Sequence, residues 1–113
     1  MYKVEIRDYR DIVRQLILKY AQYKPANGDI QTEAVIDEER GHYELIDVGW
    51  QGERRVHGSV IHIDIIGDKV WLQHDGTNAV IADELVAAGI PQAAIVLGFR
   101  LPRVRQYTGF AVA

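Results

Sequence analysis

Residues 61–73, Ile-His-Ile-Asp-Ile-Ile-Gly-Asp-Lys-Val-Trp-Leu-Gln, decide the fold. Apolar and polar residues alternate on both sides of Gly67-Asp68, which predicts two half-buried strands joined by a two-residue turn. The expected register pairs Ile66 with Lys69, Asp64 with Trp71, and His62 with Gln73. One face of this hairpin is the expected core face and carries Ile61, Ile63, Ile65, Val70 and Leu72. The other, polar face carries His62, Asp64, Trp71 and Gln73.

Strand signals continue on the N-terminal side of this hairpin. Short β-rich runs separated by turn residues predict strands at 32–37, 42–50, 54–66 and 69–74. The breaks between them are short, so an antiparallel four-stranded meander is expected. A two-residue Gln51-Gly52 loop would mix apolar and charged residues on one face, which predicts a bulge or a longer loop there.

Helical patterns flank the predicted sheet. Apolar residues recur at spacings of three and four from Val4 to Tyr23, which predicts an amphipathic helix ended by Pro25 and the turn residues 27–29. A second helix is expected at 79–88, followed by a short helical turn at 91–94, a short apolar run at 95–99 and a brief turn after Pro102. The apolar tail 110–113 should lie against the sheet, the first helix or a second subunit. The predicted fold is therefore α+β, with an N-terminal amphipathic helix, a four-stranded antiparallel β-meander and C-terminal helices packed on the sheet, in one domain spanning 1–113.

Composition excludes several classes of protein. The chain has 113 residues, 48% of them hydrophobic and 26% charged, which is typical of a globular domain. It has no cysteine, so a disulfide framework, a zinc ribbon and a thiol nucleophile are excluded. We find no apolar run long enough to span a bilayer and no secretion signal, and we therefore expect a cytoplasmic protein without membrane contact.

Charge is distributed unevenly along the chain. The net charge is −3, which argues against a surface that coats phosphates. Seven acidic residues and one arginine lie between residues 29 and 47, whereas residues 98–113 hold three arginines and no acid. This asymmetry favours complementary contacts within the chain or between copies, and a homodimer is expected for so small a domain with an apolar tail.

Two sets of polar residues are candidates for chemistry. His62 and Asp64 share one face of a predicted strand, and Asp75 lies at the end of the next predicted strand. Three scattered groups are a weak signature of a metal site. A solvated sheet face explains these residues equally well. Asp75 and Thr77 precede the second helix, where capping is favoured over anion binding. The common nucleotide, esterase and zincin motifs are absent. We therefore predict no enzyme, no metal, no cofactor and no catalytic residue.

Aromatic and basic residues are candidates for contacts with macromolecules. Trp50 and Trp71 could stack on bases, but the acids near Trp71 favour a protein interface. A C-terminal set could contact DNA or an acidic partner, with a solvated tail as the equally weighted alternative. This set is Arg100, Arg103, Arg105 and Tyr107.

Several motifs together resemble one family. They are Arg40-x-His42-Tyr43, Gly49-Trp50, His62-x-Asp64-Ile65, Lys69-Val70-Trp71-Leu72-Gln73-x-Asp75-Gly76-Thr77, Glu84-Leu85-Val86-x-Ala88-Gly89-Ile90-Pro91, Ile95-Val96-Leu97-Gly98-Phe99 and the ending Phe110-Ala111-Val112-Ala113. The chain resembles the XisI family, the fdxN element excision controlling factors of cyanobacteria, over nearly its whole length. The resemblance implies a small α+β cytoplasmic protein that helps to control a programmed DNA rearrangement during heterocyst development. It also implies a site-specific recombinase and an XisH-like protein as partners, and it supplies no catalytic residues.

Three hypotheses follow for function. The preferred one is a non-enzymatic regulator that binds an XisH-like protein, and the partner surface is expected to include His62, Asp64, Trp71, Asp75, Thr77 and Trp50. The second is direct DNA binding through Arg100, Arg103, Arg105 and Tyr107. The third is a metal-assisted nuclease subunit that uses His62, Asp64 and Asp75.

Overall fold

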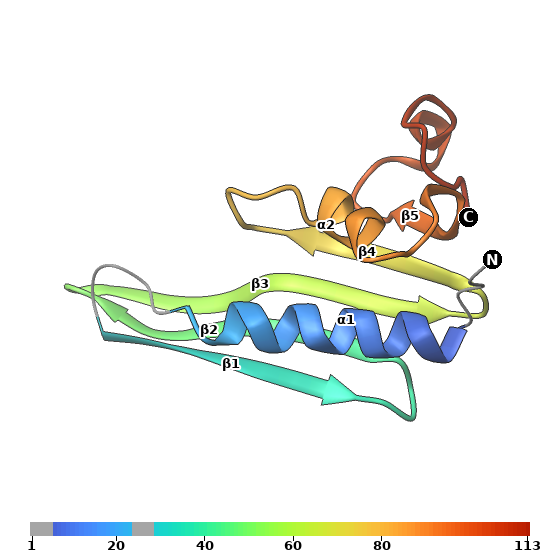
Figure 1. The fold of residues 1–113 in the computed structure, drawn as a ribbon. Helices are drawn as coiled ribbons and strands as arrows, with labels where there is room; N and C mark the ends of the chain where they lie inside the picture. The colour runs from blue at the N-terminus through green and yellow to red at the C-terminus, as the bar shows by residue number, and fades with distance from the viewer. Residues whose placement is uncertain (1–5, 24–28) are drawn as a thin grey trace.

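A long helix runs along one face of a five-stranded sheet, roughly in the direction of its strands (Figure 1). The computed structural model describes residues 6–23 and 29–113, with side chains from residue 8 onward. Helix α1 spans Ile6–Ala21. The predicted start of this helix at Val4, and the turn residues 25, 27 and 28, lie outside the described residues.

The sheet is mixed rather than purely antiparallel. Strands β1 (Asp29–Asp37), β2 (His42–Gln51), β3 (Arg54–Ile66) and β4 (Lys69–Asp75) pair antiparallel in chain order, which confirms the predicted meander. A fifth strand, β5 (Ile95–Leu97), pairs parallel to β4, so the prediction of four strands was wrong. All three β5 residues are buried. Three residues are at the lower limit of strand length, so the sequence indicated only a short apolar segment here.

The register of the central hairpin matches the prediction near the turn and departs from it further on. Asp64 lies opposite Trp71, as expected, but a shift between His62 and Ile63 sets His62 opposite His74 instead of Gln73. Between β2 and β3 the turn is again short, since Gln51 pairs with Arg54. The loop is therefore the two residues Gly52 and Glu53, and the bulge or longer loop predicted at this turn is not found. Val48 lies opposite His57, so the mixed pattern persists on one face, and the register irregularity of this strand pair lies further along, between Leu45 and Ile46.

The core lies between the sheet and the helices. Helix α1 buries Tyr9, Val13, Leu16 and Ile17. The strands contribute buried Tyr43, Leu45, Ile61, Ile63, Ile65, Val70 and Leu72 to the same cluster. Helix α2 (Ile81–Ala87) adds Ile81, Ala82 and Leu85, so the second predicted helix does share the core. No helix in the described part of the chain is long and apolar enough to cross a membrane.

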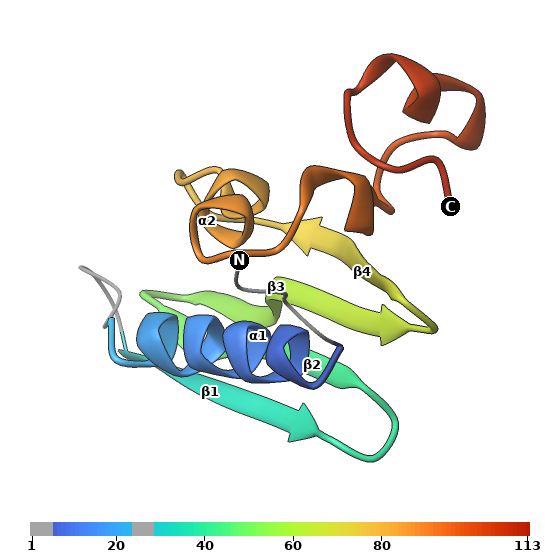
Figure 2. The same cartoon turned by 45° about the vertical axis from the view of Figure 1, so that its right-hand side comes forward.

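The C-terminal segment closes the β5 edge of the sheet. After the 3-10 helix η1 (Gln92–Ala94) and β5, the chain forms the 3-10 helix η2 (Pro102–Tyr107) in a small lobe beside β5 (Figure 2). The amide of Ala111 then donates a 2.8 Å hydrogen bond to the carbonyl of Ile95. Phe110 packs against the core cluster. Of the three positions predicted for the apolar tail, the sheet is the one observed.

Candidate functional site

A carboxylate surrounded by hydrogen-bond donors lies on the sheet face opposite helix α1. The side chain of Asp64, on β3, is 2.8 Å from Nδ1 of His42 and 2.9 Å from Nε2 of His62, both measured to Oδ1. Its other oxygen accepts a 3.2 Å hydrogen bond from Nε2 of Gln73 on β4. Asp64 exposes only 8% of its surface, and apart from Arg105 it is the one buried polar residue in the described part of the chain. We call His42, His62, Asp64 and Gln73 the Asp64 cluster.

Strand register explains why these side chains meet. His42 is the first residue of β2 and lies directly opposite Asp64, while His62 lies two residues before Asp64 on the same face. Gly41 sets the start of β2, since its φ of +73° belongs to the left-handed region and its carbonyl accepts a 2.8 Å hydrogen bond from the Ile65 amide. A Cβ at Gly41 would lie 2.8 Å from the carbonyl oxygen of Ile65. The glycine therefore fixes His42 beside Asp64.

The Asp64 cluster keeps its carboxylate ionised. Burial on its own raises the pKa of Asp64, but hydrogen bonds from His42, His62 and Gln73 and the charge of His62 outweigh it. The pKa of Asp64 is therefore lowered from its ordinary value. An ionised carboxylate only accepts hydrogen bonds, so both ring nitrogens that face Asp64 carry a hydrogen.

Histidine 42 was missed in the candidate set drawn from the sequence. The prediction grouped His62 and Asp64 with Asp75, which the structure places elsewhere. The sequence signal for His42 was the Arg40-x-His42-Tyr43 motif at the start of a predicted strand. That His42 lies beside Asp64, however, follows only from the register between β2 and β3. Ligand atoms of His42, His62 and Asp64 all lie within 4.8 Å of one another, so these three residues could hold a metal ion.

Asp75 and Thr77 do not join the Asp64 cluster. Oδ1 of Asp75 accepts hydrogen bonds of 3.0 and 2.6 Å from the amide and hydroxyl of Thr77, and Oδ2 accepts a 3.1 Å bond from the amide of Ile81. Asp75 pairs with the core residue Ile61, so it lies on the helix side of the sheet. Asp75 thus satisfies the first amide of α2, but Thr77 bonds to no helix amide and the N-cap residue Val80 has no side-chain cap bond, so the predicted capping role holds for Asp75 alone. The proposed set of His62, Asp64 and Asp75 is not assembled.

Arg105 is a structural residue rather than part of an open basic patch. Its guanidinium lies 5.0 Å from the ring centre of Trp71 and donates hydrogen bonds to the carbonyls of Arg100 and Gly98 at 3.1 and 3.4 Å. Only 9% of its surface is exposed. The expected use of Arg105 for DNA contact is therefore corrected, because the side chain is buried, its guanidinium lies over Trp71 and two of its N–H groups are bonded to carbonyls. Trp71, which is expected on a partner surface, is half-buried and has this guanidinium against its ring.

The other C-terminal candidates remain on the surface. Arg100 is exposed and lies 5.2 Å from the ring centre of Phe99. Arg103 and Tyr107 are also exposed. The expected basic patch of three arginines thus consists of two.

Trp50 lies far from the Asp64 cluster. It is near the turn of the β2–β3 hairpin, eight residues along β2 from His42, or roughly 26 Å in an extended strand. Trp50 is 49% exposed, and the guanidinium of Arg55 lies 5.2 Å from its ring centre. The residues predicted for one partner surface are therefore divided: His62, Asp64 and Trp50 are spread along the face opposite α1, whereas Asp75 lies on the helix side.

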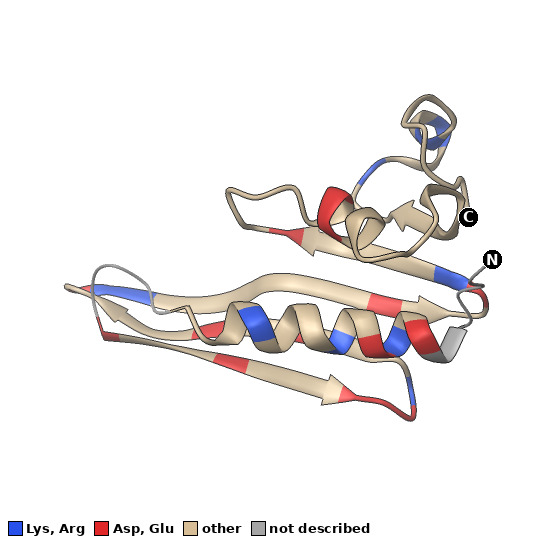
Figure 3. Cartoon of the chain, viewed as in Figure 1, with Lys and Arg blue, Asp and Glu red and all other residues tan. Residues whose placement is uncertain are grey.

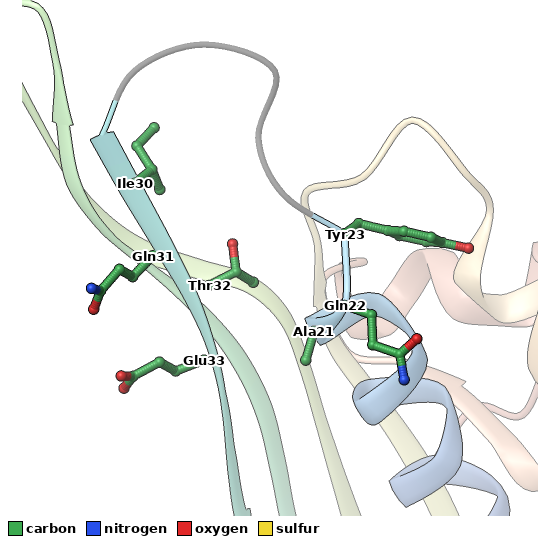
Figure 4. A pocket seen from close by; sticks show the side chains of 7 residues that line it. All are labelled: Ala21, Gln22, Tyr23, Ile30, Gln31, Thr32 and Glu33. Atoms are coloured by element: carbon green, nitrogen blue, oxygen red, sulfur yellow. The ribbon is translucent and has the colours of Figure 1, made fainter.

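A cleft on the helix side carries no comparable chemistry. It measures about 590 Å³ and lies between the end of α1 and the start of β1 (Figure 4). Thr32 points toward the helix, whereas Gln31 and Glu33 point to the opposite side of the strand. Few polar groups therefore converge in this cleft, and the alternation shows directly that the two faces of β1 differ.

Comparison with known proteins assigns the family. A family model described as XisI protein matches residues 1–112. The crystal structure of a XisI-like protein from Anabaena variabilis is 40% identical, with a TM-score of 0.90 over 96% of this chain and 100% of that one. The fdxN element excision controlling factor XisI from the same organism is 37% identical, with a TM-score of 0.79 over 93% of this chain and 96% of that one. No curated protein matches the sequence. From a family match that spans nearly the whole chain and two solved relatives of the same fold, we conclude that this protein belongs to the XisI family.

Proposed function

We propose that this protein is a non-enzymatic accessory factor that controls recombinase-mediated excision of a DNA element by binding an XisH-like protein. Family membership supports the regulatory role, since one relative is an fdxN element excision controlling factor. The observation that carries the proposal is a sheet face that helix α1 leaves uncovered. The regulator binds its partner there, and the partner connects it to the recombinase.

The uncovered face of β1, β2 and β3 is partly apolar. We call it the open face, and it is formed by residues 29, 31, 33, 35 and 37 of β1, residues 42, 44, 46, 48 and 50 of β2, and residues 55, 57, 59, 62 and 64 of β3. Val35 is 48% exposed and Trp50 is 49% exposed. Ile46 and Val48 lie between the two edges of this surface and are only half-buried. Val35 and Trp50 lie toward opposite ends of this face, with Ile46 and Val48 between them, and apolar side chains exposed along one sheet face favour protein contact.

Charge on the open face favours a basic partner. Asp29, Glu33 and Asp37 lie on its β1 side, and Glu44 adds a further acid on β2 (Figure 3). Such a surface repels phosphates and attracts lysine and arginine side chains. The chemistry of the open face therefore supports an XisH-like partner that presents a basic surface with an apolar centre.

Direct DNA binding has weaker support. The exposed arginines of the C-terminal lobe are Arg100 and Arg103, because Arg105 is enclosed. Two arginines would neutralise about two phosphates, which provides little affinity at physiological salt. We therefore place DNA contact with the partner.

A binding titration between the purified full chain and an XisH-like protein from the same genome tests the proposal. We expect a complex at micromolar or lower concentration. Trp50→Ala should weaken it at least about 10-fold, because exposed aromatic residues dominate protein interfaces. Leu18→Ala is the matched control, since Leu18 is an exposed apolar residue on α1, and it should change affinity less than about 2-fold.

Two results would overturn this function. One is the absence of any complex at micromolar concentration. The other is a labelled duplex that binds the chain alone, with an affinity that falls steeply between about 50 and 200 mM salt, because that dependence shows direct phosphate contact. In that case Arg100→Ala and Arg103→Ala would be the next variants.

A further inference from the structure

We propose that His42, His62 and Asp64 form a binding site for one divalent transition-metal ion of the zinc class. Two imidazole nitrogens and one carboxylate oxygen are a ligand set that Zn²⁺ uses in proteins. The three ligand atoms come from the adjacent strands β2 and β3 and lie within 4.8 Å of one another. This site does not depend on the proposed partner, because all three ligands belong to this chain.

The geometry of the Asp64 cluster is close to what an ion requires. With metal–ligand distances of about 2.1 Å, tetrahedral coordination separates the ligand atoms by about 3.4 Å. The two nitrogen–oxygen distances in the cluster are 2.8 and 2.9 Å. Each pair therefore has to open by roughly half an ångström to admit the ion. His42 can make this adjustment, because 55% of its side chain is exposed at the first residue of β2.

Outer contacts hold the carboxylate in the orientation that binding needs. Gln73 donates to Oδ2 of Asp64, which leaves Oδ1 facing the two histidines. Gly98 leaves space for this glutamine, because a Cβ at that position would lie 2.4 Å from Oε1 of Gln73. Ligand carboxylates in metal sites are commonly oriented by such outer hydrogen bonds.

Metal binding requires that the ring nitrogens of His42 and His62 that face Asp64 carry no hydrogen. In the metal-free chain each ring donates a hydrogen bond to the ionised Asp64. A bound ion would replace these two hydrogen bonds with bonds from the metal to the same three atoms. A neutral imidazole can carry its hydrogen on the other ring nitrogen, which leaves the nitrogen that faces Asp64 with a lone pair for the ion. Acid opposes binding, since protonated imidazole has no lone pair to offer.

The site is open to solvent on one side. The side chains of His42 and His62 are 55% and 34% exposed, while Asp64 forms the buried base. Three protein ligands leave at least one position of a tetrahedral ion free. That position takes water or a donor atom from a bound molecule.

Calorimetric titration of the tag-free full chain with ZnCl₂ at pH 7.5 tests the proposal. We expect one ion per chain, and no comparable binding of MgCl₂, because Mg²⁺ prefers oxygen ligands. Loss of an outer hydrogen bond typically lowers metal affinity 10- to 100-fold, so His42→Ala and His62→Ala should each lower it by more than about 10-fold. His57→Ala is the matched control, because His57 is another histidine of β3 on the open face, and it should leave the affinity unchanged.

A spectroscopic measurement keeps the test independent of folding. Trp50→Phe leaves Trp71, which lies opposite Asp64, as the single tryptophan. Cu²⁺ should quench its fluorescence at one equivalent, and His42→Ala added to this variant should abolish that saturable step while the far-UV spectrum stays unchanged. The proposal is overturned if ZnCl₂ does not bind, or if it binds equally well to the His42→Ala and His57→Ala chains.

Discussion

The two faces of the sheet are built from the same strands, but their side chains differ in burial and polarity. On the helix-covered face, Ile61, Ile63 and Leu72 are fully or almost fully buried. On the opposite face, their sequence neighbours His62, Asp64 and Gln73 form the Asp64 cluster, and Trp71 is half-buried against Arg105. Because side chains alternate along a strand, a single residue separates a position that stabilises the fold from one that is available for binding.

Polar groups on the two faces are also used differently. On the helix side they connect structural elements: Tyr20 of α1 donates to Glu84 of α2, and burial together with this contact raises the pKa of Tyr20 to about 12. On the open face the polar residues of the Asp64 cluster connect adjacent strands and leave two imidazoles accessible. Binding chemistry is therefore expected on the open face.

Truncation of one residue on each face gives the largest contrast. Ile63→Ala removes a fully buried side chain and should lower the free energy of unfolding by about 2–5 kcal/mol. Val35→Ala, on the open face, should change it by less than about 0.5 kcal/mol. Urea denaturation measures both. Equal losses would show that the open face is covered in the isolated chain.

Arg105 tests how firmly the C-terminal lobe is attached to Trp71 on β4. Arg105→Ala removes the contact with Trp71 and two hydrogen bonds to carbonyls, and it should destabilise the fold by about 1–3 kcal/mol. Arg105→Lys should not restore the loss, because an ammonium lacks the planar fork of donors. Arg103→Ala, at an exposed position, serves as the control in the same denaturation assay. A loss no greater than that of the control would contradict the attachment.

Much of this architecture could be predicted because it depends on local patterns. The alternation around Gly67 placed Ile63 and Asp64 on opposite faces, and the three- and four-residue spacing predicted α1. Capping of the second helix by Asp75 followed from residue types that satisfy exposed amides. Each of these features needs only neighbours in the sequence.

Other features depend on contacts between distant segments and escaped prediction. The strand β5 exists because three apolar residues reach the free edge of β4, which no pattern within those residues reveals. Burial of Arg105 requires the lobe to fold back over Trp71. His42 joins Asp64 across 22 positions of sequence through the β2–β3 pairing. In each case the role of the residue depends on the distant segment that it contacts rather than on its residue type.

The contribution of Asp64 to the stability of the fold depends on pH. Its pKa is lowered in the folded chain, because hydrogen bonds from the cluster outweigh the effect of burial. The stability it contributes is therefore present above the ordinary aspartate pKa of about 3.9 and is lost as the pH falls through the lower folded value. Asp64→Asn should be less stable than the parent chain by on the order of 1 kcal/mol at pH 5, and the gap should shrink toward pH 3. Urea denaturation at half-unit intervals tests this, and a gap that stays constant would contradict it.

Gly98 offers the smallest and most selective change. Gly98→Ala places a Cβ 2.4 Å from Oε1 of Gln73, and the end of that flexible side chain has to shift, which we expect to disturb its hydrogen bond to Asp64. The fold should lose less than about 1 kcal/mol, since one hydrogen bond is broken on a partly exposed face. Zinc affinity should nevertheless fall by about 10-fold, because the carboxylate loses its outer support. Gly58→Ala is the control, as a Cβ there meets no atom within 4 Å. If both alanine variants bind zinc like the parent chain, Gln73 does not orient Asp64 for metal binding, and the contact between them is only a link between β3 and β4.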